Sequence, residues 1–467
     1  MPETVPGLQR VLGVWAAMAV VVGTVIGSGI FLVSQDMIKA VGTPWMVFVV
    51  WVAGGLLTLF GALTYAELAS AMPEAGGEYV YLREAYGPFF GFLYGWSQTL
   101  VAKSASLATL ATGFYLYLEN FIPSFHTVFV TIPLPIGPGG GPLEVRTGQL
   151  FAMALILALG WLNYFGVKLS GNVQVAVTVA KVVLILGVIA VGLFGGRAHS
   201  ANLTTSIPAA GGAAGFFAAL LSALWAYDGW NNVNMVAGEV TRPQRNLPLA
   251  LIGGVLIVGA LYLATNLAYF SVLTSAEVGA SHRVAGDMVK SVLGQHGADA
   301  VSIVVMISIF AALNGSILSG SRIPYALARD GYFFRTAAGI HPQHHTPAGA
   351  ILILTAWAAV LVLSGQFKAL YTLVLVPSWI LYAMAAASVI VLRRKRPDMP
   401  RPYRTIGYPW VPIIFVGVAI LLLVSTLLDA PRESLLGLLI MAAGVPFYLH
   451  WHSRAIDDNR KRSDPVH

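Results

Sequence analysis

The segment GTVIGSGIF, residues 23–31, places three glycines within seven residues, in the middle of an apolar run that starts at Val11. Each glycine lowers helix stability by up to about 1 kcal/mol relative to alanine. A second apolar run carries the segment WAYDGWNNVN, residues 225–234, where turn-forming and polar residues replace the expected apolar ones. We therefore predict that each run forms a helix that is interrupted near its middle.

The composition identifies the environment of these helices. The chain has 467 residues, of which 57% are hydrophobic and only 10% are charged, whereas an ordinary soluble domain has roughly 25% charged residues. The apolar runs also carry many glycines and prolines, which are commoner in membrane helices than in soluble ones. This composition excludes a soluble globular protein and predicts an all-α membrane protein embedded in a lipid bilayer.

Twelve apolar runs are long enough to cross a bilayer, which takes a helix of about 20 mostly apolar residues. Helix breakers and charged loops separate them, and no stretch between them could hold a soluble domain of normal size. The predicted spans cover residues 12–39, 44–71, 88–118, 147–166, 169–196, 212–240, 246–273, 297–328, 347–365, 369–392, 408–428 and 433–451.

The basic residues indicate how these spans are oriented. If both termini are cytoplasmic, 18 of the 27 Lys and Arg residues lie on the cytoplasmic side and seven on the opposite side, while Lys103 and Lys181 lie inside spans. This asymmetry obeys the positive-inside rule. We therefore assign the excess positive charge to membrane topology and not to nucleic-acid binding, and we expect both termini in the cytoplasm.

Residue types and motifs that the sequence lacks exclude several kinds of chemistry. The chain has no cysteine, so it forms no disulfide, thiolate metal site or cysteine nucleophile. It has no HExxH motif for zinc and no Gly-Lys dipeptide for a phosphate-binding Walker A loop. His341, His344 and His345 cluster in one loop, but no carboxylate or cysteine stands nearby to complete a metal site. We expect neither an enzyme nor an ATP-driven pump, and no metal or cofactor.

The ordinal positions of the interrupted spans, 1 and 6, indicate an internal repeat. They are equivalent members of two five-span halves, and because five is odd the halves insert in opposite orientations. Interrupted helices in matching places of inverted halves point to a transporter's substrate site. Close helix packing is the alternative, but it explains only the glycines of span 1. The predicted units are residues 1–200 and 201–404, the two repeats, and 405–467, the peripheral spans and tail.

The ends of the interrupted helices offer complementary charges. The half-helix after the break in span 1 begins with free N–H groups from about Ser28 to Ile30, at the positive end of a helix dipole, and these suit a carboxylate. Unpaired carbonyls at the breaks suit an ammonium group. One small ligand with both charges, an α-amino acid, satisfies both ends. A channel would need a pore instead of two broken helices enclosing a site.

These segments resemble the amino acid–polyamine–organocation superfamily, and within it the L-type amino acid transporter (light-subunit) family. The resemblance covers roughly residues 10–450 and implies the fold named for the bacterial leucine transporter (LeuT-like), with spans 1–5 and 6–10 as inverted repeats. Besides the two interrupted segments it rests on Glu239, RNLPLA at residues 245–250, NGS at residues 314–316, Arg322 and RDG at residues 329–331.

The family pattern implies a set of substrate contacts. The substrate carboxylate would bind the N–H groups of Ser28, Gly29 and Ile30. The amine would bind the carbonyls of Val25, Trp225 and Asp228. Trp225 also stands where the family has an aromatic lid over the substrate. The remaining expected contacts are Ile26, Ala226, Asn231 and Ser316.

A lysine inside a span costs about 3 kcal/mol at the bilayer centre unless it faces a cavity or a partner. Lys181 in span 5 matches the position where sodium-independent relatives place an ammonium near a site that holds sodium in sodium-coupled ones. Tyr262 in span 7 is associated with the same region. A buried ion pair is the alternative for Lys181. Lys103 in span 3 has no clear counterpart, and we favour a structural hydrogen bond or snorkelling for it.

Two roles for Asp228 stay open. Its carboxylate could pair with the cationic side chain of arginine or lysine as substrate, or it could cap the second half of span 6, since Asp is a strong N-cap residue. Four further charged residues lie toward the cytoplasmic ends of spans, where they could form inner-gate ion pairs or stay hydrated. They are Glu67, Glu239, Arg322 and Asp330.

The resemblance implies a sodium-independent amino acid exchanger (antiporter) of the bacterial cytoplasmic (inner) membrane, carrying neutral amino acids, with cationic ones left open. A proton-coupled symporter, using protonation of Lys181, is the alternative. Eukaryotic relatives pair with a glycoprotein heavy chain through a disulfide. A chain without cysteine cannot form that bond, so we expect a functional monomer.

Overall fold

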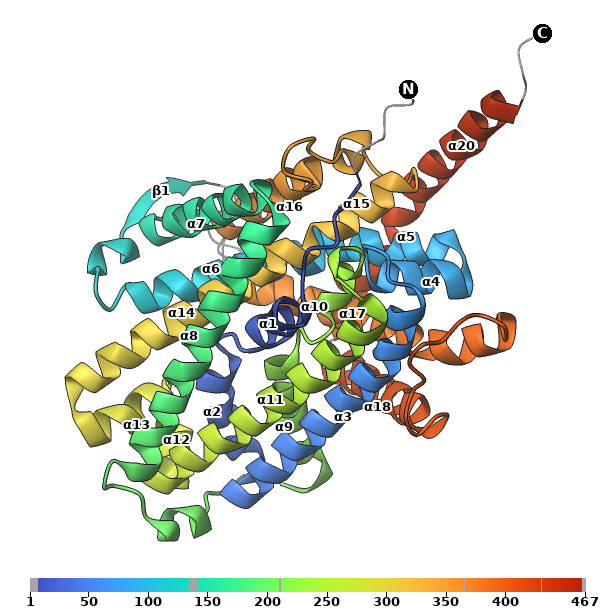
Figure 1. Cartoon of the computed structure of the whole chain (residues 1–467). Helices are drawn as coiled ribbons and strands as arrows, with labels where there is room; N and C mark the ends of the chain where they lie inside the picture. The colour runs from blue at the N-terminus through green and yellow to red at the C-terminus, as the bar shows by residue number, and fades with distance from the viewer. Residues whose placement is uncertain (1–6, 134–141, 210, 365–366, 430, 464–467) are drawn as a thin grey trace.

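The computed structural model describes residues 7–133, 142–209, 211–364, 367–429 and 431–463. It is a bundle of helices with one small β-hairpin (Figure 1). The α-helices are α1 (Val14–Val25), α2 (Gly29–Val41), α3 (Pro44–Ala71), α4 (Glu78–Tyr86), α5 (Pro88–Ser97), α6 (Lys103–Leu118), α7 (Thr147–Tyr164), α8 (Val167–Phe194), α9 (Gly212–Tyr227), α10 (Asn232–Met235), α11 (Pro243–Val272), α12 (Ser275–Ala280), α13 (Val284–Leu293), α14 (Gln295–Gly320), α15 (Arg322–Arg329), α16 (Ala348–Leu363), α17 (Phe367–Lys395), α18 (Trp410–Asp429), α19 (Pro431–Ala442) and α20 (Gly444–Ser463).

Shorter elements complete the chain. A π-helix, η1 (Gln98–Ala102), joins α5 to α6, and single turns of 3₁₀-helix occupy Pro123–His126, Ser200–Thr204, Ala237–Glu239 and Arg335–Ala338. The antiparallel strands are β1 (Val128–Ile132) and β2 (Leu143–Arg146), with an irregularity between Val128 and Val130. This hairpin lies in the long loop after span 3.

The helix predicted for span 1 is interrupted where its glycines cluster. α1 ends at Val25, α2 begins at Gly29, and their axes differ in direction by 44°. A Cβ atom at position 29 would lie 3.0 Å from both the Cα and the Cβ of Ala226. Glycine at this position therefore allows the break in span 1 to approach the end of α9.

Span 6 is interrupted in the same part of the bundle. α9 ends at Tyr227, and the helical α10 resumes only at Asn232 and lasts four residues. Gly229 has φ +99° and packs 3.2 Å from the backbone of Thr24, measured from the position a Cβ would take. A left-handed backbone favours glycine, so this residue turns the chain at the break. Both predicted interruptions are confirmed.

The apolar helices are of membrane-spanning length. Among the described residues, eight helices are long and apolar enough to cross a membrane, or nine if the bent pair α1 and α2 counts as one span. The other three predicted spans are interrupted or short: residues 88–118 form α5, η1 and α6, residues 212–240 form α9 and α10, and residues 347–365 hold the 16-residue α16. Large apolar side chains on the outer surface, such as Val183 and Leu256, are exposed, as expected of residues that face lipid.

Four helices of the early predicted spans pack against helices that lie five predicted spans later in the chain. α2 packs on α9, α3 on α11, α6 on α14 and α7 on α16. These pairs correspond to spans 1 and 6, 2 and 7, 3 and 8, and 4 and 9. α1 lies at the centre of the bundle, against α8, α11 and α14.

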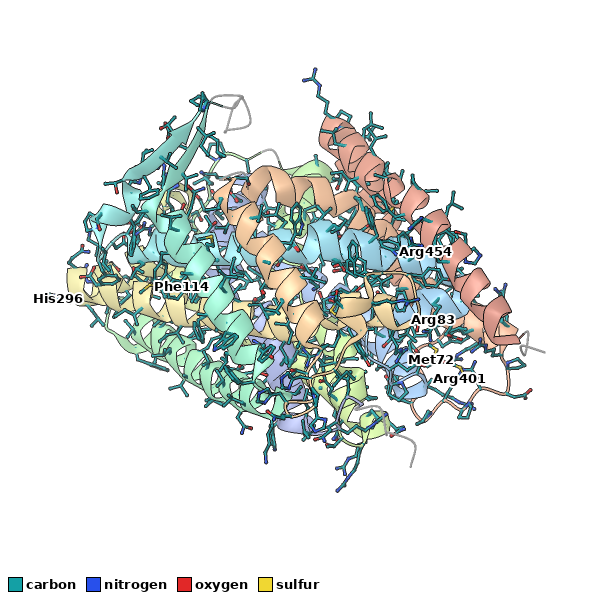
Figure 2. The ribbon with its side chains drawn as sticks, turned by 90° about the horizontal axis from the view of Figure 1, so that it is seen from above. Met72, Arg83, Phe114, His296, Arg401 and Arg454 are labelled. Atoms are coloured by element: carbon teal, nitrogen blue, oxygen red, sulfur yellow. The ribbon has the colours of Figure 1, made fainter. Side chains whose placement is uncertain are left out.

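The molecule has two opposite ends. Figure 2 shows Met72, Arg83, Arg401 and Arg454 toward one end and His296 at the other. We call the first end the terminal face, formed by residues 8–13, 72–87, 165–167, 240–243, 321–347 and 396–409. We call the second the hairpin face, formed by residues 119–133, 142–146, 195–209 and 273–294.

Candidate functional site

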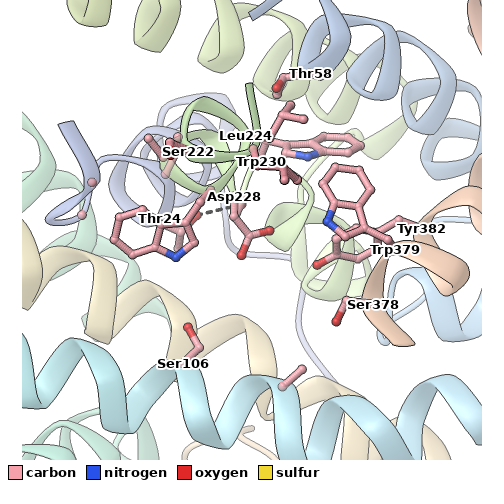
Figure 3. Close-up of a pocket in the computed structure, with 18 of the residues that line it drawn as sticks. Thr24, Thr58, Ser106, Ser222, Leu224, Asp228, Trp230, Ser378, Trp379 and Tyr382 are labelled. Atoms are coloured by element: carbon pink, nitrogen blue, oxygen red, sulfur yellow. Dashed lines mark hydrogen bonds between the residues drawn. The ribbon is translucent and has the colours of Figure 1, made fainter. Parts of the chain in front are cut away.

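A cavity of about 510 Å³ lies where the two interrupted spans meet, bordered also by α3, α6, α17 and α18 (Figure 3). Irregular backbone at membrane depth must be buried in protein or line a cavity. This cavity meets that requirement for the two breaks. Seven of the predicted site residues line it: Val25, Ser28, Gly29, Trp225, Ala226, Asp228 and Ser316.

The start of α2 presents unpaired N–H groups at this cavity. Phe31 is the first residue of α2 whose N–H finds a backbone acceptor, the Ser28 carbonyl at 3.1 Å. Among the described residues, the N–H groups of Ser28, Gly29 and Ile30 have no backbone acceptor. Helix N-termini of this kind attract anions through their free donors and the helix dipole. The side chain of Ile30 itself is fully buried outside the cavity lining.

The carbonyls expected to bind an amine already have some protein donors. The Val25 carbonyl accepts from the Gly27 N–H at 2.8 Å, and the Trp225 carbonyl accepts from the Asp228 N–H at 3.2 Å. The Tyr262 hydroxyl lies 2.8 Å from the Ala226 carbonyl and 3.2 Å from that of Val25. A phenol carries one proton, so donation to Ala226 leaves Val25 a lone pair for a ligand.

Tyr262 therefore joins the two breaks, although it does not line the cavity. Its hydroxyl reaches one carbonyl from each interrupted span, and its ring is buried against Trp51, with ring centres 5.0 Å apart. This position agrees with the association predicted between Tyr262 and the region of the break.

Lys181 on α8 is fully buried beside the break in span 1, outside the cavity lining. Its ammonium donates to the Gly23 carbonyl at 2.8 Å and to the Ile26 carbonyl. Ser308 on α14 donates to the same Ile26 carbonyl at 3.0 Å. The break leaves the carbonyls of Gly23 and Ile26 without hydrogen bonds inside the helix. Side chains from two neighbouring helices, α8 and α14, donate to them instead. Among the described residues no acidic side chain pairs with Lys181, so the alternative of an ion pair is not realised.

Asp228 is exposed to the cavity. Figure 3 shows its carboxylate directed into the open space between Ser106 and Trp379. The Gly229 N–H and Tyr382 are its hydrogen-bond partners. α10 begins at Asn232 with Asn231 as its N-cap residue, so Asp228 does not occupy the N-cap position of the second half of span 6.

Lys103 also lines the cavity, with its side chain largely buried. Its ammonium donates to the Oδ1 of Asn232, which fits the predicted structural hydrogen bond. The same ammonium interacts electrostatically with Asp228. Among the described residues, the cavity lining therefore holds one lysine, Lys103, and two acidic residues, Asp36 and Asp228.

Two other predicted contacts, Ile26 and Asn231, lie outside the cavity lining. Ile26 offers only its carbonyl, which Lys181 and Ser308 occupy. Asn231 is fully buried and donates from its Nδ2 to the Oε1 of Glu78 on α4.

Sequence reasoning missed most of the aromatic wall of the cavity. A partial signal for this wall is present in the sequence, because the PSW tripeptide at residues 377–379 puts a proline and a serine inside span 10. The further lining residues include Thr24, Gln98, Trp230, Ser378, Trp379, Tyr382, Phe415 and Leu422.

On the terminal-face side of the cavity, ion pairs join the helices. Arg322 and Glu239 form a fully buried pair with two contacts of 2.8 Å. Glu74 accepts from Arg329 at 2.9 Å, and Arg83 pairs with Asp330. Glu67 pairs with Arg393 at 2.7 Å. The four charged residues predicted near these ends are thus all paired.

The loop histidines do not form a metal site in the part of the chain that the structure describes, where no group of three or more His, Asp or Glu residues could hold a metal ion. His341 and His344 stack instead, with ring centres 4.5 Å apart.

Comparison with known proteins gives a consistent picture. The family model described as amino acid permease matches residues 12–444. The chain is 32% identical over 445 residues to the serine/threonine exchanger SteT of Bacillus subtilis (strain 168), covering 95% of this chain and 97% of that protein. It is 31% identical over 468 residues to the human b(0,+)-type amino acid transporter 1, covering 100% and 92%. It is 29% identical over 456 residues to the human cystine/glutamate transporter, covering 94% and 85%.

Proposed function

The chain belongs to the amino acid permease family, and from this premise we propose that it is an amino acid exchanger that works by alternating access. Its function is transport and not catalysis, as for the relatives named above. The observation that carries the proposal is the meeting of two broken helices at one cavity, with the free N–H groups of α2 on one side and Asp228 on the other.

The substrate we propose is an α-amino acid held by both of its charges. Its carboxylate binds the N–H groups of Ser28, Gly29 and Ile30, and its ammonium binds carbonyls at the breaks, those of Val25 and Trp225 among them. The cavity of about 510 Å³ has room for a side chain beyond the zwitterion. Asp228 extends the range to cationic amino acids, and Trp225 covers the bound substrate.

We propose twelve spans in a LeuT-like arrangement, with inverted repeats at residues 1–200 and 201–404 and peripheral spans at 405–467. The pairing of α2 with α9, α3 with α11, α6 with α14 and α7 with α16 supports a two-fold relation between the halves. Each predicted span also overlaps at least one helix of the structure.

We assign the terminal face to the cytoplasm of a bacterial cell and the hairpin face to its exterior. The basic residues support this orientation through the positive-inside rule. The ion pairs close the terminal face, whereas the exposed Asp36 on α2 lines the cavity toward the hairpin face. The conformation is therefore one that faces outward.

We further propose that transport needs no sodium and that the chain acts as a monomer. The Lys181 ammonium already binds the carbonyls at the break in span 1, where a cation is needed. A proton-coupled symporter is the second candidate, because Lys181 is buried without an acidic partner among the described residues. The absence of cysteine from the sequence supports a state without a disulfide-linked partner.

Counterflow in proteoliposomes tests the function. Vesicles loaded with an unlabelled amino acid should accumulate the labelled one, and empty vesicles should not. Thermal stabilisation of the purified protein should be strong with the amino acid and weak with its amide or its decarboxylated amine, because each lacks one charge. Equal stabilisation by all three compounds would contradict the zwitterion site.

A further inference from the structure

Glu78, the first residue of α4, carries a carboxylate that is fully buried next to the break in span 6. Its Oε1 accepts from the Nδ2 of Asn231, and its Oε2 accepts from the Tyr94 hydroxyl at 2.9 Å. Among the described residues no Lys or Arg forms an ion pair with it. A buried carboxylate without an ion pair is costly to keep charged, so its charge state is open to change.

Polar contacts connect Glu78 to the cavity. Asn231, which binds Glu78, is followed by Asn232, which accepts from Lys103 of the cavity lining. The charge of Lys103 also acts on Glu78. A change in the charge of Glu78 therefore alters its interactions with both the break in span 6 and the Lys103 ammonium in the cavity.

Several buried polar atoms around this connection have no partner in the protein. They lie on α5, η1, α10 and the break in span 6, and Gln98 among them lines the cavity. Buried polar atoms without a protein partner favour internal water, which can carry protons between the cavity and Glu78. These atoms are Ser97 Oγ, Gln98 Nε2, Thr99 Oγ1, Asn231 Oδ1 and both side-chain polar atoms of Asn234.

The titratable groups that interact with the charge of Glu78 lie on α3, α4, α5 and α6. Three tyrosines and one lysine interact with its charge: Tyr65 on α3, Tyr81 on α4, Tyr94 on α5 and Lys103 on α6. The cations of the other helices packed on α4 are bound elsewhere. Arg322 and Arg329 of α15 bind Glu239 and Glu74, and Arg393 and Lys395 of α17 bind Glu67 and the Ala85 carbonyl.

Burial raises the pKa of the Glu78 carboxyl above its ordinary value, and the hydrogen bonds from Asn231 and Tyr94 and the charge of Lys103 only partly oppose this rise. The protonated form is thus brought closer to neutral pH.

We propose that Glu78 is a proton-binding site that controls the α4–span 6 contact and so makes the exchange rate depend on pH. This inference rests on the proposed exchange function and deepens it. A proton from hydronium, passed along internal water, converts the carboxylate to the neutral acid and leaves water; the reverse step returns it.

Asn231 is the contact through which the charge state of Glu78 acts on the break. Its amide carries a donor and an acceptor, and the donor Nδ2 is used while the acceptor Oδ1 has no partner. The ionised carboxylate accepts two hydrogen bonds, and the one from Asn231 links α4 to the break. In the neutral acid one oxygen becomes an O–H donor and the group is a weaker acceptor, so this link weakens and the terminal face opens more easily. Exchange should therefore speed up on acidification.

The test is counterflow with full-length protein at a series of pH values from about 5 to about 8.5, because burial raises the pKa of a carboxyl. Wild type should exchange several-fold faster at the acidic end. Glu78→Gln, which mimics the neutral acid, should exchange fast at every pH. Glu84→Gln, the same change on the same helix, should keep the wild-type pH profile because Glu84 is paired with Arg83 and Arg396 at the surface.

A pH-independent wild type, or a Glu78→Gln variant with the wild-type pH profile, would overturn the proposal while leaving exchange itself intact. Absence of counterflow in wild type at any pH would instead sink the proposed function.

If the Glu78→Gln variant does not transport, the pH dependence of its thermal unfolding tests the proposal instead. The folded pKa of Glu78 lies above the unfolded one, so this group's contribution to wild-type stability is present at low pH and is lost as the pH rises between the two values. The melting temperature of the variant relative to wild type should therefore rise with pH. A difference that stays constant with pH would also overturn the proposal.

Discussion

Gly29 lies so close to Ala226 that a methyl group at position 29 would come within 3.0 Å of the Ala226 Cα and Cβ. Gly29 opens α2 and Ala226 stands one residue before the end of α9. The two interrupted spans therefore touch at the point where their helical ends face the cavity. The separation between the N–H groups of one break and the carbonyls of the other depends on this contact.

Gly29→Ala should force the two breaks apart. The added methyl meets the Cα and Cβ of Ala226, neither of which can rotate away, and overpacking of this kind costs about 1–3 kcal/mol. We expect weaker substrate-induced thermal stabilisation and slower counterflow. Gly13→Ala is the control, because nothing lies within 4 Å of a methyl group there. Equal substrate stabilisation of the two variants would show that the contact does not shape the site.

Asp228→Asn should weaken competition by arginine and lysine against a neutral substrate. The carboxylate faces the cavity, and a hydrogen bond to a charged group contributes about 1.5–3 kcal/mol, so inhibition by cationic amino acids should fall on the order of tenfold. Inhibition by neutral amino acids should change little. Competition assays in proteoliposomes measure both, and a loss that is the same for all amino acids would reject charge recognition.

Lys181→Ala should slow exchange on the order of tenfold, because it removes charged hydrogen bonds to the carbonyls of Gly23 and Ile26. Replacing sodium by choline should leave the unmodified protein's uptake unchanged. Uptake that strictly requires sodium would refute the assigned role of Lys181. A pH gradient that drives accumulation into vesicles without internal substrate would favour the symporter.

Arg322→Ala should strongly destabilise the protein. Arg322 and Glu239 are both fully buried, and removing one partner of such a pair costs about 3–5 kcal/mol because the other charge is left unpaired. The double change Arg322→Met with Glu239→Leu should recover much of this loss. Arg329→Ala breaks a pair that is 39% and 44% exposed, so it should cost less than about 1 kcal/mol. Thermal unfolding of the purified variants compares the three.

The sequence by itself determined the membrane-embedded class and the two interruptions, because both follow from local properties. Apolar runs of about 20 residues form spanning helices wherever they occur. Clustered glycines at 23, 27 and 29 and polar residues from Asp228 onward weaken a regular helix wherever they occur. The facing of Ser28, Gly29, Trp225 and Asp228 toward one cavity followed from the same breaks.

Only the tertiary structure decided which way the side chains at the breaks turn. Asn231 and Asp228 are three residues apart, yet one is buried against Glu78 and the other is exposed to the cavity. Lys103 contacts Asn232, and Tyr262 contacts carbonyls of both breaks. Two of these three contacts join residues more than a hundred positions apart in the sequence. Outside a regular helix no fixed period sets side-chain direction, so long-range packing sets it, and a local pattern cannot show it.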